Sequence, residues 1–426
     1  MDEGGSQRKV SDRRHNNRLL PHTKGVMVRR FFFGAALTAL IIAVFAMPAA
    51  AATNPTSVQW VSANIDKIGK ALKTEGVIPA TASKAQTTKA VLTYLQAKFS
   101  KPEDHPRSSI VTRTGKVIKY DPKCYSLANL HKSRFAIGEP YVSHTLVILV
   151  DFGSDATGSG PLHGQIPPPG PADNSTFWPG DFSTTHYQKM LFGNSYPIYD
   201  ASGDLRGTSH DTMRSYYLEQ SHMAFTVGGD VVAWVTVPHP ESWYGADTAS
   251  GIDDANGPVW RVVEDAVDTL AAQHPDFPWA EYDQENPFGL EGGSFYQPDG
   301  YIDHLILVHA GVDESAGGGA QGSDAIWAHS WWVNPSGGGV MIPGTQTAGN
   351  PDGIWVGPYT INPEDGGIGV FCHEFGHDLG LPDEYDTTYT GEETSGFWTL
   401  MSDGSWCGKA WGLETRPSPM NAWDKY

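Results

Sequence analysis

One stretch near the C-terminal end carries two histidines and a glutamate at the spacing that metal-dependent hydrolases use. It reads His-Glu-Phe-Gly-His from His373 to His377. Because an α-helix turns by about 100° per residue, side chains four positions apart lie on one face. His373 and His377 can therefore present both imidazoles to one metal ion, and Glu374 beside them can reach a water molecule at that ion. The pattern predicts a zinc centre with Glu374 as the catalytic residue.

The residues after the second histidine supply a third ligand. Gly380 is suited to end the helix, since glycine adopts the left-handed conformation of a C-terminal cap without a Cβ clash. The chain then leads to two adjacent carboxylates, Asp383 and Glu384. Asp383 lies 10 residues after His373, whereas Glu384 has the longer side chain, and both stay open as the ligand. Three protein ligands and one open position are typical of a catalytic zinc site.

A methionine and two cysteines accompany this motif. Met401 lies 18 residues after Asp383 in the stretch 396–403, and it resembles the methionine turn that forms an apolar floor under the metal of metzincin peptidases. Cys372 precedes the first histidine and Cys407 follows the methionine, so we expect both near the site. A disulfide between them suits a secreted protein, and two free, buried thiols are the alternative.

The motif from residue 373 to residue 386 resembles the immune inhibitor A family of secreted bacterial metallopeptidases. The resemblance covers the chain from about residue 140 to its end. It implies an α/β, metzincin-like zinc peptidase domain, in which a twisted sheet carries the zinc helix beneath an open cleft. It also implies a secreted precursor, or zymogen, that acts on protein or peptide substrates and is inhibited by its own propeptide. Softer matches to the same family lie at residues 177–182, 216–220, 309–311 and 317–327.

On this interpretation the chain is a zinc-dependent endopeptidase. Zinc lowers the pKa of water toward neutrality, and Glu374 takes a proton from that water as it attacks the peptide carbonyl, then delivers the proton to the leaving amine. The alternative is an inactive or latent secreted module of the same fold that binds zinc or serves in adhesion. A serine hydrolase is disfavoured, since the chain contains no Gly-x-Ser-x-Gly motif.

Composition divides the chain into three expected parts. Residues 1–51 contain an apolar run that follows two arginines and ends in small residues, which is typical of a cleaved secretory signal; Met27 is an alternative start. The run is short for a membrane anchor. Helical periodicity over residues 52–106 predicts a helical propeptide spanning 52–139, and residues 140–426 are the expected catalytic domain. Family members continue into further β-rich domains, so we expect this chain to be truncated at its C-terminus. The secretory signal and the resemblance also predict an extracellular protein.

The net charge of the chain indicates which binding partners to expect. The net charge is −19, and an acidic chain lacks the clustered Lys and Arg that phosphate binding needs, so no nucleic acid is expected.

Three cysteines are too few for a disulfide scaffold. Cys124 alone could be a latency thiol on the zinc, although a lone cysteine is more often structural. Calcium is a second candidate cofactor at the Gly- and Asp-rich stretches 251–257 and 297–303, with plain polar turns as the alternative.

Apolar runs and helical periodicity place the elements around the motif. Gly228-Gly229 predicts a hairpin between strands at 225–227 and 230–237. By the resemblance, the strand near Trp327 forms the upper rim of the cleft and binds the substrate backbone by strand addition. The other expected strands lie at 144–151, 303–309 and 325–331, and the expected helices lie at 185–191, 209–220 and 259–273.

Overall fold

The computed structural model describes residues 59–99, 110–115, 117–118, 139–156, 158–170, 173, 175–248, 253–254, 258–287, 293–392, 394–408 and 411–425. All of them belong to the compact unit Thr53–Tyr426. The expected signal peptide, residues 100–109 of the expected propeptide and Cys124 lie outside the described residues. Among the helices of the described ranges, none has the length and apolar character that a membrane span requires.

A six-stranded sheet lies at the centre of this unit, with the strand order β1-β9-β12-β8-β4-β7. The four strands from β12 to β7 run parallel, whereas β9 and β1 are antiparallel to their neighbours. Every residue of β8 is buried, as expected for a parallel strand that is covered on both faces. The strands are β1 (Gln59–Trp60), β4 (Tyr141–Phe152), β7 (Phe225–Val237), β8 (His304–His309), β9 (His329–Trp332) and β12 (Pro358–Pro363).

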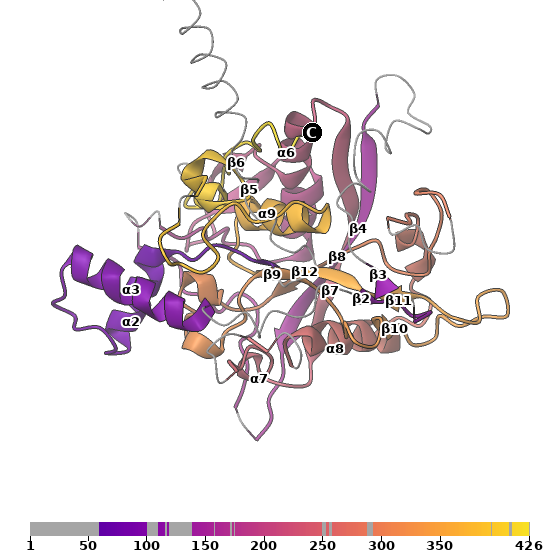
Figure 1. The fold of residues 1–426 in the computed structure, drawn as a ribbon, viewed down its shortest axis with the longest axis horizontal. Coiled ribbons are helices and arrows are strands. Elements are labelled where there is room, and N and C mark those ends of the chain that lie inside the picture. The colour runs from indigo at the N-terminus through magenta and orange to yellow at the C-terminus, as the bar shows by residue number, and fades with distance from the viewer. Residues whose placement is uncertain are drawn as a thin grey trace, which may run out of the picture. The chain divides into compact units, whose positions relative to one another are not determined.

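Helices cover both faces of the sheet. In Figure 1, α6 and α9 lie on one side of the sheet, and α7 and α8 lie on the other. Both α6 and α8 contact β7. The α-helices are α2 (Ile65–Thr74), α3 (Lys84–Phe99), α5 (Thr184–Tyr187), α6 (Met213–Gln220), α7 (Glu241–Tyr244), α8 (Pro258–Gln273) and α9 (Ile368–Asp378).

Short elements complete the unit. A π-helical turn, η3 (Gln188–Phe192), continues α5, and 3₁₀ turns are η4 (Trp279–Tyr282), η6 (Glu314–Ala316), η7 (Gly322–Asp324), η8 (Gly396–Trp398) and η9 (Asp403–Trp406). Three two-stranded sheets pair β2 (Ile110–Val111) with β3 (Val117–Ile118), β5 (Tyr196–Tyr199) with β6 (Leu205–Ser209), and β10 (Val340–Met341) with β11 (Trp355–Val356).

The α/β class is confirmed, as are the strands expected at 144–151 and 303–309 and the helix expected at 259–273. The strand expected at 325–331 begins later, at His329. The helix expected at 209–220 begins at Met213, because Ser209 still belongs to β6 and the Thr212 side chain caps the first turn by accepting from Ser215 N–H. The helix expected at 185–191 is split between α5 and the π-helical η3.

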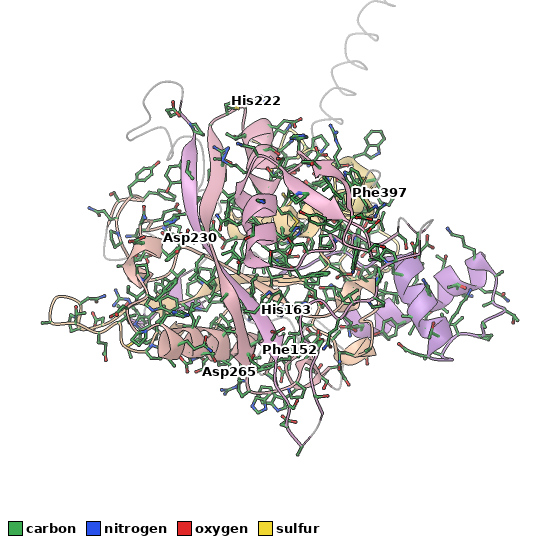
Figure 2. The ribbon with its side chains drawn as sticks, turned by 180° about the vertical axis from the view of Figure 1, so that it is seen from behind. Phe152, His163, His222, Asp230, Asp265 and Phe397 are labelled. Atoms are coloured by element: carbon green, nitrogen blue, oxygen red, sulfur yellow. The ribbon has the colours of Figure 1, made fainter. Side chains whose placement is uncertain are left out.

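The hairpin predicted at Gly228-Gly229 is wrong. Residues on both sides of these glycines belong to one continuous strand, β7, which pairs in parallel with β4 along its whole length. Figure 2 shows these two long strands side by side, with Asp230 on β7 and Phe152 at the end of β4. Gly229 serves close backbone approach, because a Cβ there would lie 1.9 Å from the carbonyl oxygen of Thr145. A glycine pair within a strand pattern can mark such an approach as well as a turn.

The N-terminal end of the helical pattern also differs from expectation. Trp60 and Val61 follow helical spacing, but the helix begins only at Ile65, with the side chain of Asn64 accepting a hydrogen bond from Lys67 N–H as its cap. Before that cap, Gln59 and Trp60 form β1. Beyond it, α2 and α3 are helical as predicted, and their apolar faces join the same hydrophobic core as the sheet through Ile68, Leu72, Val91 and Leu95.

Candidate metal centre

Helix α9 carries the histidine motif and is buried along nearly its whole length. Every residue from Ile368 to His377 is buried, since the helix packs against β12 and β9. Tyr217 O–H on α6 donates to Cys372 O at 2.7 Å. At the other end of the helix, the His304 ring on β8 bonds to the carboxylate of Asp378. These two contacts hold the helix at both ends of the motif.

The helix ends where glycine was expected to end it. Gly380 adopts φ 97°, the left-handed region, and its N–H donates to His377 O at 2.8 Å. Leu381 N–H donates to Gly376 O at 2.9 Å, which turns the chain back along the helix. This reversal brings Asp383 to the two histidines.

Three ligand atoms converge at this point. The Nε2 atoms of His373 and His377 lie 3.1 Å apart. Asp383 Oδ1 lies 3.3 Å from the first and 3.2 Å from the second. The Nδ1 atoms face the other way, with His373 Nδ1 2.9 Å from Leu400 O and His377 Nδ1 2.7 Å from Leu381 O. Because a carbonyl oxygen only accepts, each Nδ1 carries the proton and each Nε2 turns a lone pair to the common centre.

The charge balance of this cluster favours a cation. Burial lowers the pKa of the His373 imidazole, although the nearby carboxylate of Asp383 opposes the shift. Burial alone would raise the pKa of Asp383, but attraction to His377 and His373 lowers it below its ordinary value. The two Nε2 atoms and one carboxylate oxygen therefore converge on one point, and Asp383 Oδ1 has no hydrogen-bond donor. The donor set and its spacing fit a tetrahedral metal ion.

Glu374 lies beside the cluster without a hydrogen-bond partner. It is fully buried, and neither carboxylate oxygen is hydrogen bonded. Burial raises its pKa well above the ordinary value, and the charges of Asp383 and Asp313 add to the shift. A buried carboxyl group with both oxygens unsatisfied is costly in a purely structural role. Its position beside the three ligand atoms suits a group that exchanges a proton there.

The structure distinguishes Asp383 from Glu384, the two carboxylates that the sequence left as alternative metal ligands. Asp383 belongs to the three-residue cluster with the histidines. Glu384 points away: both of its carboxylate oxygens accept from Asn421 Nδ2 at 2.7 Å, and its backbone N–H donates to Met401 O at 2.7 Å. The alternative assignment of Glu384 as a metal ligand therefore does not fit this geometry.

Met401 packs directly against the motif. It is fully buried, and a Cβ added at Gly376 would lie 2.7 Å from its Sδ atom. The preceding residue, Leu400, supplies the carbonyl oxygen that holds His373. The turn therefore contacts the helix face between the two histidines and supports the first of them.

The predicted disulfide is wrong. Cys372 and Cys407 are both free thiols. Cys372 is fully buried in the hydrophobic core, and burial raises its pKa well above the ordinary value. Cys407 is partly exposed, and its Sγ accepts a hydrogen bond from Ser418 Oγ at 3.4 Å. Two cysteines that flank a site in sequence can still direct their side chains into different surroundings.

Residues 59–64 lie between the sheet edge and the chain that follows the histidine motif, a position that the sequence did not predict. Residues 59–64 run along the sheet edge where strand addition was expected: β1 pairs with β9, and Val61 N–H donates to Ala328 O at 3.0 Å. On its other side, the segment contacts residues that follow the histidine motif. The Tyr385 hydroxyl donates to Trp60 O, Ala63 N–H donates to the Tyr389 hydroxyl at 2.9 Å, and Trp406 Nε1 donates to Ser62 O at 2.9 Å.

The aspartates of the two stretches considered for calcium have different surroundings. Asp303, in 297–303, is satisfied by the backbone N–H groups of Gln284 and Glu285. Asp253, in 251–257, joins a second carboxylate cluster with Asp247 and Glu314. In the described part of the chain these stretches contribute to no other cluster of metal-ligating side chains.

Comparisons with known proteins agree with this geometry. Residues 132–426 match the family described as "Immune inhibitor A peptidase M6, catalytic domain". The chain belongs to the immune inhibitor A family. The resemblance inferred from the motif is thereby confirmed, and the chain carries the catalytic domain of a metal-dependent peptidase.

Two relatives in this family extend the match. The chain is 45% identical over 249 residues to "Immune inhibitor A" of Bacillus thuringiensis subsp. alesti. The aligned residues cover 57% of this chain and 35% of the relative. It is 33% identical over 374 residues to the "Pre-pro-metalloprotease PrtV" of Vibrio cholerae serotype O1, which covers 85% of this chain and 38% of that relative. The matched regions therefore span less than two fifths of either immune inhibitor A-family relative.

Proposed function

We propose that this chain is a secreted zinc endopeptidase that is made as a precursor. His373, His377 and Asp383 hold the zinc ion, and Glu374 is the general base and acid. The observation that carries the proposal is the convergence of two Nε2 atoms and one carboxylate oxygen within 3.1–3.3 Å of one another, beside a buried carboxyl group with no partner. Zinc, when bound, supplies a Lewis acid that activates water and polarises the scissile carbonyl.

The residues around the metal ligands have separate tasks in this mechanism. Glu374 takes the proton from the attacking water and passes it to the nitrogen of the leaving amine. The carbonyl oxygens of Leu400 and Leu381 hold the two imidazoles in the tautomer that directs Nε2 to the metal. Strand β9 offers its edge to an extended peptide backbone, whose side chains then alternate between the cleft and solvent.

We further propose that residues 52–139 are a propeptide that keeps the enzyme latent. The support is that β1 already pairs with the β9 edge as an antiparallel strand and that Val61 N–H extends this pairing to Ala328 O, with Tyr385 and Trp406 bonded to the backbone of the same segment. A substrate strand needs the same edge, so the two exclude each other. The relative's printed name, a pre-pro-metalloprotease, is consistent with such a segment. Secretion and protein substrates are part of the same proposal.

The test measures zinc and hydrolysis on the same preparations. The secreted protein is assayed for zinc by mass spectrometry and for casein hydrolysis, before and after removal of the N-terminal segment, with and without a chelator. We expect near-stoichiometric zinc and chelator-sensitive hydrolysis that rises after trimming. Glu374→Gln should keep the zinc and lose ~10²–10⁴-fold in kcat, the range for removal of a general base. Glu392→Gln, an exposed glutamate, is the matched control.

The outcomes separate the rival functions. Zinc binding without hydrolysis after trimming would favour the latent or adhesion module of the same fold. Absence of zinc from a folded protein would contradict the metal centre itself.

A further inference from the structure

The backbone of residues 60–64 is hydrogen bonded along its length to the part of the chain that matches the peptidase family. At the sheet edge, Val61 N–H donates to Ala328 O at 3.0 Å, which continues the pairing of β1 with β9. Further along, Asn64 N–H donates to Ser315 O at 2.9 Å. These contacts use main-chain groups of the N-terminal segment, which any other peptide also possesses.

Three aromatic side chains donate hydrogen bonds to consecutive carbonyl oxygens of the same backbone. The bonds run from Tyr385 O–H to Trp60 O, from Trp327 Nε1 to Val61 O at 2.8 Å, and from Trp406 Nε1 to Ser62 O at 2.9 Å. The last indole nitrogen also lies 3.1 Å from Ser62 Oγ. The donors come from three separate places in the chain: before β9, after the histidine motif, and in η9. Tertiary structure therefore brings them to one line of carbonyl groups.

A fourth aromatic residue binds an amide of this backbone. Ala63 N–H donates to the Tyr389 hydroxyl at 2.9 Å. The ring centres of Tyr385 and Tyr389 lie 6.1 Å apart, so the two hydroxyls belong to one surface. Because a hydroxyl both donates and accepts, whereas an indole only donates, the four side chains match the C=O and the N–H groups of a peptide.

Two of these donors are buried and depend on the backbone that they bind. Trp327 is fully buried, and Trp406 is 6% exposed. A buried N–H without an acceptor is unfavourable, so removal of the N-terminal segment leaves two donors that a new peptide backbone would satisfy. The same surface adjoins the metal ligands, since Tyr385 follows Asp383 by two positions and η9 contacts α9.

We propose that Trp327, Tyr385, Tyr389 and Trp406 form an aromatic clamp that binds the main chain of the peptide substrate beside the edge of β9. The inference rests on the proposed function and adds side-chain partners to the strand addition at β9. A substrate residue in the place of Val61 or Ala63 must present an N–H group, so proline is excluded there. A helical segment is excluded as well, because its N–H and C=O groups already bond to one another. The substrate is thus an extended polypeptide segment.

The first test measures the same variants before and after the N-terminal segment is removed from the folded, zinc-loaded chain. Tyr385→Phe and Tyr389→Phe each remove one hydroxyl, and Trp406→Phe removes one indole N–H. The matched controls are Tyr199→Phe, on β5, and Trp423→Phe, at a position that is 78% exposed. Casein hydrolysis gives kcat and KM, while zinc content and the urea midpoint show that each variant is folded.

We expect each clamp variant to change hydrolysis in opposite directions in the two forms. Before trimming, loss of a bond loosens the N-terminal segment, and hydrolysis rises by roughly 5-fold. After trimming, the same loss weakens the hold on the substrate, and kcat/KM falls by roughly 5-fold. A fall in both forms would show a merely structural role. A rise or no change after trimming would show that these residues hold only the N-terminal segment. Either result would overturn the proposal.

A binding measurement keeps the test independent of hydrolysis. The trimmed, zinc-loaded Glu374→Gln chain is titrated with a fluorescent peptide that copies residues 58–65, and with the same peptide carrying one N-methyl group. Methylation in the place of Val61 or Ala63 should weaken binding by ~10-fold or more, because a bonded N–H is lost. Methylation at Ser62, whose N–H has no backbone acceptor among the described residues, is the control.

The two measurements separate the clamp from the proposed function. Equal affinity for the three N-methyl peptides would contradict the clamp even in an active enzyme. The expected order of affinities in a chain that hydrolyses no casein would support the clamp and contradict the peptidase.

Discussion

Trp60 lies directly opposite His329 in the antiparallel pair of β1 and β9, and its carbonyl oxygen accepts a hydrogen bond from Tyr385. Tyr385 follows Asp383 by two positions. The N-terminal segment is therefore bonded on one side to the sheet edge and on the other to the chain that leaves the histidine cluster. Removing this segment breaks both sets of contacts and leaves the β9 edge unpaired.

Weakening the β1–β9 pairing should raise the activity of the untrimmed chain. Val61→Pro removes the N–H that donates to Ala328 O at 3.0 Å, at a cost of about 1 kcal/mol or more. We expect casein hydrolysis before trimming to rise ~5-fold or more, in line with that energy. Val61→Ala keeps the N–H and is the control. Equal activity of the two variants would show that the backbone pairing does not restrain the enzyme.

The third ligand can be tested with two neighbouring substitutions. Asp383→Asn removes the only carboxylate among the described residues that faces both histidines, and zinc affinity should fall by ~100-fold or more, beyond the loss caused by an outer-sphere partner. Glu384→Gln should retain zinc and lose about 1 kcal/mol of stability through its bonds to Asn421. Zinc content after dialysis against a weak chelator measures both. The reverse pattern would make Glu384 the ligand.

The contact between Gly376 and Met401 predicts a coupled pair of substitutions. A methyl group at position 376 would lie 2.7 Å from Met401 Sδ, so Gly376→Ala should cost about 1–3 kcal/mol through overpacking and should weaken zinc binding. Met401→Ala should cost a similar amount through a cavity. In the double variant the two changes compensate, so its urea midpoint should lie above the additive value. Strict additivity would mean that the two side chains do not meet.

A buried histidine outside the site should make the fold sensitive to acid. Burial lowers the pKa of His186 to about 4, and neither ring nitrogen has a hydrogen-bond partner. Between pH 6.5 and 4 the unfolded chain binds a proton that the folded chain does not. Stability is therefore fully present above the unfolded pKa and falls as the pH drops through this window, by about 3 kcal/mol.

Replacing this histidine should remove that part of the pH dependence. His186→Phe keeps an aromatic ring against Phe177 and Tyr196. Its urea midpoint should change less between pH 7 and pH 4.5 than that of the wild type. His274→Phe, at an exposed position, is the control and should keep the wild-type slope. An unchanged slope in His186→Phe would show that this ring is protonated in the folded chain.

Local features of the chain were predicted well because they depend on short-range geometry. The spacing of His373 and His377 predicts a shared face on any helix, and Gly380 predicts the helix end that its φ of 97° confirms. Long apolar runs predicted β4 and β8, since parallel strands that are buried on both faces carry such runs. Gly229 was misread because the same residue type permits a turn and a close backbone approach.

The amino-acid sequence by itself determined the family, the two imidazoles and the glutamate between them, because helical periodicity brings those groups together without help from the rest of the chain. The tertiary structure decided which of Asp383 and Glu384 faces the histidines, since Asn421, far along the chain, binds the other. It also brought Trp60 to the β9 edge and Lys98 into three carboxylates. The contacts of Trp60 and Lys98 join residues more than a hundred positions apart, and no local pattern encodes their distance.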